Sequence, residues 1–218
     1  DKLPKEHIVD RYLKTLGPLG IAADGSGLDF FFATDLTPPQ LPESFATAPV
    51  VLVVGAKLNT KQLPVHKLVE ITNAIDRPIV LIGGPEDKVL GNQVAEQTNG
   101  TVYNACGALS LQASAYVIKG AAAVITHDTG MMHIAAAFNK NIVSVWGNTI
   151  PEFGMYPYLP QGGASFISEV QGLDCRPCSK IGFNTCPKGH FKCMEEQNMA
   201  NIIDKVVNFQ KVDDSTDQ

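Results

Sequence analysis

The sequence lacks the defining features of several protein classes. No apolar run reaches the ~18 residues that a membrane-spanning helix requires, and residues 1–17 have neither the basic start nor the long apolar core of a secretion signal. Basic residues are in deficit, with 17 Lys and Arg against 22 Asp and Glu. The net charge of −5 repels a polyanion unless basic groups cluster, so nucleic-acid binding is disfavoured.

Cysteine is also scarce, and its distribution is local. Four of the five cysteines lie between Cys175 and Cys193, while Cys106 stands alone, so no disulfide framework spreads through the fold. This usage suits a reducing compartment. With 218 residues, 44% of them hydrophobic and 18% charged, the chain can bury an ordinary core. Because it begins with Asp1 instead of Met, we expect a piece cut from a longer chain.

Short apolar runs alternate with helical patterns through the middle of the chain. The runs are mostly continuous, as in parallel strands covered by helices on both faces. Between them, helices are predicted to begin at Pro64 and after Glu86 and Ser110. The order predicts an α/β fold with a doubly wound, Rossmann-like parallel sheet and a ligand at the carboxyl ends of its strands. The expected strands are residues 50–55, 78–82, 101–103, 122–126 and 142–146.

The segments on either side of this region do not show the same alternation of strands and helices. A helix within residues 1–16 would place Ile8, Tyr12, Leu13 and Leu16 on one side, and residues 28–32 form one strand-like run. We divide the chain into an N-terminal helix and linker lead (1–49), a Rossmann-like domain (50–170), a cysteine finger (171–194), a C-terminal helix packing on the domain (195–212) and a disordered tail (213–218).

The strongest chemical signal is the segment 127–133 (HDTGMMH). It starts where a predicted strand ends and runs into a helical pattern, so it predicts a strand, a tight turn and a helix. The free amides of Thr129, Gly130 and Met131 would form the positive end of the helix dipole, which suits phosphate. Asp128 would repel phosphate, so a sugar hydroxyl is its more sensible partner. In the simpler alternative, Asp128 only caps the helix.

Two other predicted strand ends supply complementary groups. After the first strand, Lys57 and Lys61 lie in a loop within reach of a diphosphate, although loop lysines are commonly just solvated. After the second, Glu86 can accept hydrogen bonds from ribose hydroxyls, or it simply favours the helix start. Together with the Asp128 turn, these loops predict a site for a nucleoside diphosphate joined to a sugar. No GxGxxG follows the first strand, which disfavours a dinucleotide cofactor.

At these residues the sequence resembles glycosyltransferase family 9, the heptosyltransferases that build the inner core of lipopolysaccharide. The resemblance covers about residues 50–146 and is most specific at the turn 128–130 (DTG) and the helix after it. Residues 61–64 (KQLP) are similar to the family's Lys-x-Trp-Pro, with leucine in place of tryptophan. Residues 84–86 (GPE) are similar to its ribose-binding loop, and 109–111 (LSL) to the segment that packs on the base.

The resemblance implies one half of a two-domain GT-B fold, the half that binds an ADP-sugar, here ADP-heptose, for transfer with inversion. For His133, the alternative to a role in this site is that it is an ordinary core or surface histidine. The implied contacts are Lys61, Thr129 and Gly130 to the diphosphate, Glu86 to the ribose, Leu109 to the adenine and Asp128 to the sugar, with Met131 and His133 completing the site.

In such enzymes an N-terminal domain holds the acceptor and supplies the general base, and the predicted sheet leaves no room for it before Val50. We therefore expect this fragment to bind nucleotide without turnover. The resemblance implies a lipid-linked saccharide acceptor, no cofactor for the chemistry, and a cytoplasmic enzyme that is peripheral at the inner face of the inner membrane. Two alternatives stay open: a GT-B-type nucleotide-sugar epimerase, and a non-catalytic metal-finger assembly module on a nucleotide-binding platform.

The cysteine segment has the spacing of a metal site. Cys175, Cys178, Cys186 and Cys193 are separated by two, seven and six residues. Four thiolates can close a tetrahedron around a structural zinc or iron, which leaves no open position for catalysis. His190 is a substitute ligand, and two disulfides or four reduced thiols are alternatives.

The same segment is basic. Residues 174–193 contain four Lys and Arg residues and one Asp, a net charge of +3 on an acidic chain. Such a patch suits a phosphorylated lipid acceptor or an anionic membrane surface, and solvated loop lysines are the alternative.

Overall fold

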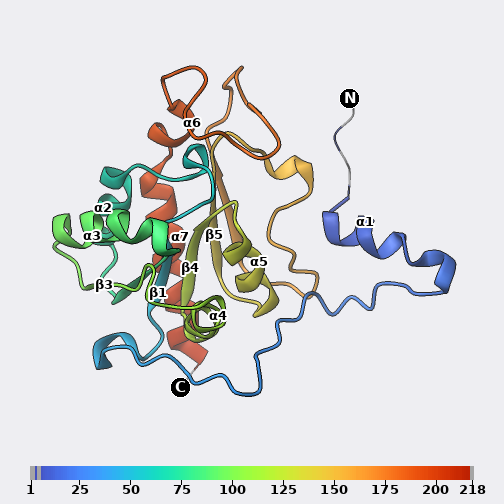
Figure 1. Ribbon diagram of the computed structural model, residues 1–218, viewed down its shortest axis with the longest axis horizontal. Coiled ribbons are helices and arrows are strands. Elements are labelled where there is room, and N and C mark those ends of the chain that lie inside the picture. The colour runs from blue at the N-terminus through green and yellow to red at the C-terminus, as the bar shows by residue number, and fades with distance from the viewer. Residues whose placement is uncertain (1–2, 4–5, 217–218) are drawn as a thin grey trace.

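A six-stranded parallel sheet runs through the middle of the molecule (Figure 1). The computed structural model describes residue 3 and residues 6–216. All five predicted strands are present, each within about two residues of its predicted bounds. The strands are β1 (Val50–Val53), β2 (Ile79–Ile82), β3 (Val102–Asn104), β4 (Ala123–His127), β5 (Ile142–Trp146) and β6 (Ser165–Glu169).

The strand order confirms the doubly wound, Rossmann-like class. The sheet reads β3-β2-β1-β4-β5-β6, and each neighbouring pair is parallel. The order reverses between β1 and β4, so the loops that leave these two strands diverge to opposite sides and open a crevice at their carboxyl ends. The sixth strand, β6, escaped the sequence analysis because it is an edge strand with partly exposed residues and lacks a continuous apolar run.

Helices cover both faces of the sheet (Figure 1). Side chains of α2, α3 and α7 form one hydrophobic core with the sheet, and side chains of α4 and α5 form the second. Along β1, Val50 and Leu52 face the first core while Val51 and Val53 face the second, which explains the unbroken apolar run. These helices are α2 (Val65–Ala74), α3 (Lys88–Gln97), α4 (Leu111–Gly120), α5 (Gly130–Ala137) and α7 (Met199–Thr216).

Short helices fill several connections. Two of them matter for the site: η3 (Asn59–Lys61) follows β1 and η4 (Pro85–Asp87) follows β2. Pro64, expected as the first residue of a helix, is instead the N-cap of α2. The remaining short helices are η1 (Gly17–Leu19), η2 (Glu43–Phe45), η5 (Pro151–Phe153) and α6 (Lys192–Glu195).

The N-terminal lead contains the predicted helix. Helix α1 (Ile8–Lys14) has no buried residue and stands apart from the sheet (Figure 1), so its apolar side does not pack on the domain. Polar contacts hold it: the buried His7 lies 2.8 Å from the carbonyl oxygen of Tyr156. The strand-like run at residues 28–32 forms no strand and is extended. It packs through its aromatic rings, with Phe32 stacked 5.6 Å from Phe138.

The C-terminal helix packs as predicted, with Met199, Ile202 and Val206 buried on the first core. It starts later than expected, because α6 ends the cysteine segment as a separate turn of helix. It also continues to Thr216, where a disordered tail was predicted from Asp213; residues 217 and 218 lie outside the described part. Within residue 3 and residues 6–216, no helix combines the length and the hydropathy needed to cross a membrane.

Candidate functional site

Asp128 lies at the crevice of the sheet, directly after β4. Its side chain is only 8% exposed and accepts two hydrogen bonds on Oδ2. One comes from the ammonium of Lys61 at 2.6 Å and the other from the hydroxyl of Thr149 at 2.9 Å. Lys61 ends η3 after β1, and Thr149 follows β5. The fold thus brings three strand ends to one carboxylate, and Lys61 is paired with it.

The start of α5 is open. Thr129, not Asp128, is the N-cap, and its side chain does not cap the helix. Its hydroxyl oxygen lies 3.3 Å from that of Thr126. Gly130 is exposed, and nothing lies within 4 Å of the position that a Cβ would take there. The first turn of α5 thus lacks a side-chain cap and has open space beside Gly130, which is compatible with an anion at the helix N-terminus.

His127 connects β4 to the loop that carries Lys61. Its Nε2 accepts a hydrogen bond from the amide of Leu63 at 3.0 Å, so this nitrogen must be deprotonated. The ring is 1% exposed, and burial lowers its pKa to about 4, against opposing effects of Gly55 and Asp128. The neutral imidazole fixes the loop after β1, a role that the sequence analysis did not assign.

Glu86 lies on η4 after β2, where its exposed carboxylate folds back over Gly84. A Cβ at Gly84 would stand 2.5 Å from a Glu86 oxygen, so only glycine leaves room for this conformation. The neighbouring Asp87 is buried and accepts a hydrogen bond from the Gly84 amide at 2.8 Å. Burial raises the pKa of Asp87, which Gly84 partly offsets. Asp87 thereby holds the turn that presents Glu86.

Leu109 lies in the loop before α4 and packs against the second core. This loop touches the Glu86 turn, because the amide of Gly107 donates to the carbonyl of Gly83 at 3.1 Å. Ser110 caps α4 as predicted, accepting from the amide of Ala113 at 3.2 Å. The residues expected around a nucleoside thus come from two touching loops after β2 and β3.

The two remaining predicted residues lie on α5. Met131 packs partly buried against the second core, beside the open helix start. His133 is half-buried, and burial lowers its pKa, as does the nearby His7, while Asp128 opposes them. His133 is therefore close enough to Asp128 and His7 to be influenced by both, and its ring forms no hydrogen bond with other described residues.

Two residues after β5 were missed by sequence reasoning. Thr149 donates to Asp128, as described above. Asn148 is 1% exposed, and neither its amide nitrogen nor its amide oxygen has a partner among the described residues. A buried amide of this kind normally binds water or a ligand. Both residues follow a predicted strand at the expected edge, which was the signal available in the sequence.

Arg176 ties the cysteine segment to the sheet. Its guanidinium donates to the carbonyls of Gly147, Val170 and Thr149 and pairs with Glu169 at 2.8 Å. The backbone adds a bond from the Cys178 amide to the carbonyl oxygen of Asn148 at 3.0 Å. This segment is thereby anchored at the carboxyl edge of β5 and β6, close to the site.

The four clustered cysteines are free thiols, so the two disulfides considered as an alternative do not form. Burial, with repulsion from the neighbouring Cys178, raises the pKa of Cys193 to about 11, and Cys193 lies in the first core. Burial also tends to raise the pKa of Cys186, but four backbone amides outweigh it and lower that pKa. The Sγ of Cys175 lies 3.9 Å from Nε2 of His190. Over the described residues, no three His, Cys, Asp or Glu side chains are arranged to hold a metal ion.

Comparison with known proteins points to one family. The family described as "Glycosyltransferase family 9 (heptosyltransferase)" matches residues 1–203. A curated relative, lipooligosaccharide heptosyltransferase 2 of Haemophilus influenzae, is 30% identical over 91 residues, which are 40% of this chain and 26% of that protein. The aligned segment thus spans about a quarter of the relative's length.

Solved structures share the fold. The glycosyl transferase family 9 protein from Veillonella parvula DSM 2008 superposes with a TM-score of 0.74 at 20% identity, covering 96% of this chain and 62% of that one. TibC of enterotoxigenic Escherichia coli H10407, a dodecameric iron-containing heptosyltransferase solved in complex with ADP-D-β-D-heptose, superposes with a TM-score of 0.56 at 14% identity, covering 82% of this chain and 48% of that one.

Proposed function

Because the chain belongs to glycosyltransferase family 9, we propose that it is the donor-binding half of an inverting GT-B glycosyltransferase that uses ADP-heptose. The acceptor in this proposal is the lipopolysaccharide core or a related lipid-linked saccharide, met in the cytoplasm at the inner face of the inner membrane. The observation that carries the proposal is the contact of Lys61 with Asp128 at the crevice, beside an uncapped helix start.

The chemistry of the groups suggests how the donor is divided among them. The amides of Thr129, Gly130 and Met131 would take the diphosphate, with the Lys61 ammonium neutralising it. Asp128, aided by Thr149, would accept from hydroxyls of the sugar. Glu86 would accept from ribose hydroxyls, and Leu109 would pack on the adenine, with His133 at the sugar end.

These groups would accelerate transfer by stabilising the leaving diphosphate. As the bond between the sugar and the diphosphate breaks, negative charge develops on the phosphate oxygen, and prearranged amides and an ammonium are suited to stabilise it. The reaction requires no cofactor in this scheme. Asp128 lies on the donor side, so it is a positioning group for the sugar, and the base that deprotonates the acceptor must come from a region outside these 218 residues.

Calorimetry with ADP, ADP-heptose, UDP-glucose and GDP-mannose tests the proposal. We expect micromolar binding of ADP and ADP-heptose, at least about tenfold weaker binding of the other two, and no transfer or hydrolysis by this chain alone. Absence of binding by every nucleotide would refute the donor role. Conversion of a nucleotide-sugar without acceptor would indicate the epimerase alternative.

We further propose that Cys175, Cys178, Cys186 and Cys193 bind one structural metal ion, zinc or iron. The amides around Cys186 lower the pKa of its thiol and so favour the thiolate, which is the form that binds metal. Burial raises the pKa of Cys178 and Cys193, and the other cysteines of the segment add to this increase. Closing the site requires Cys193 to turn out of the core. The iron-containing TibC offers a parallel of the same fold.

Metal analysis of protein purified without added metal tests this second proposal. We expect about one equivalent per chain, lost in Cys186→Ser and retained in Cys106→Ser. Cys106 is a matched control because it is a buried thiol near Asp87, apart from the cysteine segment. A metal-free sample with all five thiols titratable would refute the site.

A further inference from the structure

The cysteine segment presents a tip that combines exposed apolar and basic side chains. Ile181 is 70% exposed and Phe183 is 38% exposed. Three lysines of the same segment, Lys180, Lys188 and Lys192, are exposed as well. From Cys175 to Met194 the sequence contains no Asp or Glu. We call Lys180, Ile181, Phe183, Lys188 and Lys192 the finger tip.

The apolar part of the finger tip is held in place. The Ser179 hydroxyl accepts from the amides of Ile181 and Gly182 at 3.2 and 2.7 Å. Phe183 exchanges bonds with Thr60, donating its amide to Oγ1 at 2.7 Å and accepting from the Thr60 amide at 3.1 Å. The tight turn therefore fixes the backbone and leaves the Ile181 side chain in solvent. Contact with a partner would remove this apolar surface from water, which is favourable.

The charge of the finger tip is largely uncompensated. Arg176 is occupied by Glu169 and three carbonyls, so it adds no free charge to the tip. Lys192 has only a distant exposed pairing with Glu196, 3.7 Å away, which contributes little. The cysteine segment thus carries three exposed lysines and two exposed apolar side chains on a chain whose net charge is −5. An anionic surface complements this local field, whereas the rest of the chain repels it.

We propose that the finger tip docks on an anionic lipid bilayer, with Ile181 and Phe183 entering the headgroup region and the three lysines facing lipid phosphates. Each lysine near an anionic membrane contributes about 1 kcal/mol, and short apolar side chains at the interface add to this. The binding is therefore weak, reversible and sensitive to salt.

The position of the finger tip relates this surface to the site. Gly182 packs against Leu58 and Thr60, in the loop that leads from β1 to Lys61. Docking would therefore bring the crevice close to the bilayer. The inference deepens the proposed function, because a lipid-linked acceptor lies at such a surface, but lipid binding itself does not require the donor to bind.

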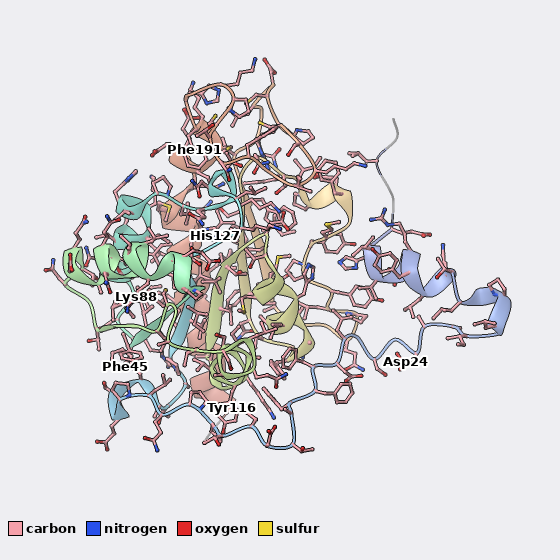
Figure 2. The ribbon with its side chains drawn as sticks, viewed as in Figure 1. Asp24, Phe45, Lys88, Tyr116, His127 and Phe191 are labelled. Atoms are coloured by element: carbon pink, nitrogen blue, oxygen red, sulfur yellow. The ribbon has the colours of Figure 1, made fainter. Side chains whose placement is uncertain are left out.

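A second exposed pair provides a matched control. Lys88 and Val89 are also a lysine beside an aliphatic side chain, and Val89 is 67% exposed. They lie on α3, next to the acidic Glu86 and Asp87. Figure 2 shows Lys88 on the flank of the molecule, away from the end where Phe191 marks the cysteine segment. The control changes the same residue types on a different face.

Vesicle co-sedimentation tests the proposal with the 218-residue chain, without nucleotide. Vesicles of phosphatidylglycerol and phosphatidylcholine in equal parts are compared with pure phosphatidylcholine. We expect at least about tenfold stronger partitioning onto the anionic vesicles, weakened by added salt. Ile181→Ser with Phe183→Ser, and separately Lys180→Glu with Lys188→Glu, should each lower it at least about fivefold, while Lys88→Glu with Val89→Ser should not.

Three outcomes would overturn the proposal: equal binding to both vesicle types, equal loss in the control variant, or loss of binding on adding inorganic phosphate at constant ionic strength. The last would indicate a site for soluble phosphate. Circular dichroism and calorimetry with ADP check that each variant remains folded. A chain that binds ADP but no vesicles refutes only the docking surface, and a chain that binds vesicles but no ADP refutes only the donor site.

Discussion

The ammonium of Lys61 lies 2.6 Å from Oδ2 of Asp128, so the groups that sequence reasoning assigned to the diphosphate and to the sugar are bound to each other. Both side chains are largely buried, and Lys61 also lies 3.4 Å from the Asp128 carbonyl oxygen. In the proposed function, a bound diphosphate would compete with Asp128 for the charge of Lys61. The carboxylate would then be free to accept hydrogen bonds from the sugar.

This pairing predicts opposite effects of Asp128→Asn on two ligands. Asparagine can still accept from Thr149 but no longer holds Lys61 by charge. ADP should therefore bind as tightly as before or a few-fold more tightly, while ADP-heptose should lose about tenfold, since hydrogen bonds to a charged group are worth about 1.5–3 kcal/mol. Calorimetry of both ligands measures this. Asp24→Asn is the control, because Asp24 is an exposed carboxylate on the N-terminal segment, well away from His127 (Figure 2). Equal losses for both ligands would contradict the assignment.

Gly130→Ala should separate stability from binding. A methyl group at this position meets nothing within 4 Å, and alanine is favoured over glycine in a helix, so the unfolding free energy should stay the same or rise by up to about 1 kcal/mol. The same methyl group would crowd the amides that face the diphosphate, so ADP affinity should fall about tenfold. Gly120→Ala, equally unobstructed at the end of α4, should leave ADP affinity unchanged. Unchanged ADP affinity in Gly130→Ala would argue against the anion site.

His127 should make stability depend on pH. Its pKa is about 4 in the folded protein against 6.5 as the ordinary value, so the unfolded chain binds the proton first as pH falls. Its contribution is fully present above about pH 6.5 and is lost as pH falls toward 4, up to about 3 kcal/mol in all. His127→Gln keeps an acceptor for the Leu63 amide but cannot titrate. Urea unfolding at several pH values should show a shallower acid loss in this variant, with the effects of His7 and His133 common to both proteins. Parallel pH profiles would refute this account.

Arg176→Lys should release the cysteine segment. Lysine keeps the charge but cannot reach four acceptors at once, and the partly buried carbonyls of Gly147 and Val170 would lose their donors. We expect the free energy of unfolding to fall by about 2–4 kcal/mol, because each buried polar group that loses its partner costs about 1–3 kcal/mol. Limited proteolysis should cut first within residues 174–194. Lys180→Arg, at an exposed position of the same segment, is the control. Unchanged protease resistance would show that other contacts hold the segment.

The sequence predicted most of the sheet for a simple reason. In a doubly wound domain the central strands are buried on both faces, so β1, β2, β4 and β5 appear as unbroken apolar runs, and Ser110 marks a helix start by its own hydrogen bond. β6 was not predicted from the pattern, because it lies at an edge where burial is partial. The helix α1 was predicted, but its apolar residues are not covered by the domain.

The sequence also predicted which kinds of side chain gather at the site, because the turns after parallel strands meet at one edge of the sheet. From the sequence alone came the strand-turn-helix unit at 127–133, the loop carrying Lys61 and the turn carrying Glu86. The sequence did not predict which side chains form hydrogen bonds with one another across the sheet. The hydrogen bond from Thr149 to Asp128 joins residues 21 positions apart, and that from Leu63 to His127 joins residues 64 apart.

Local sequence determined which segments become strands, helices and tight turns, because burial pattern and capping act over a few neighbouring residues. Only the tertiary structure decided that Lys61 neutralises Asp128, that His127 stays neutral and that Arg176 joins the cysteine segment to the sheet. Such pairings depend on strand order and on the dielectric environment created by burial, and these arise only when distant parts of the chain meet.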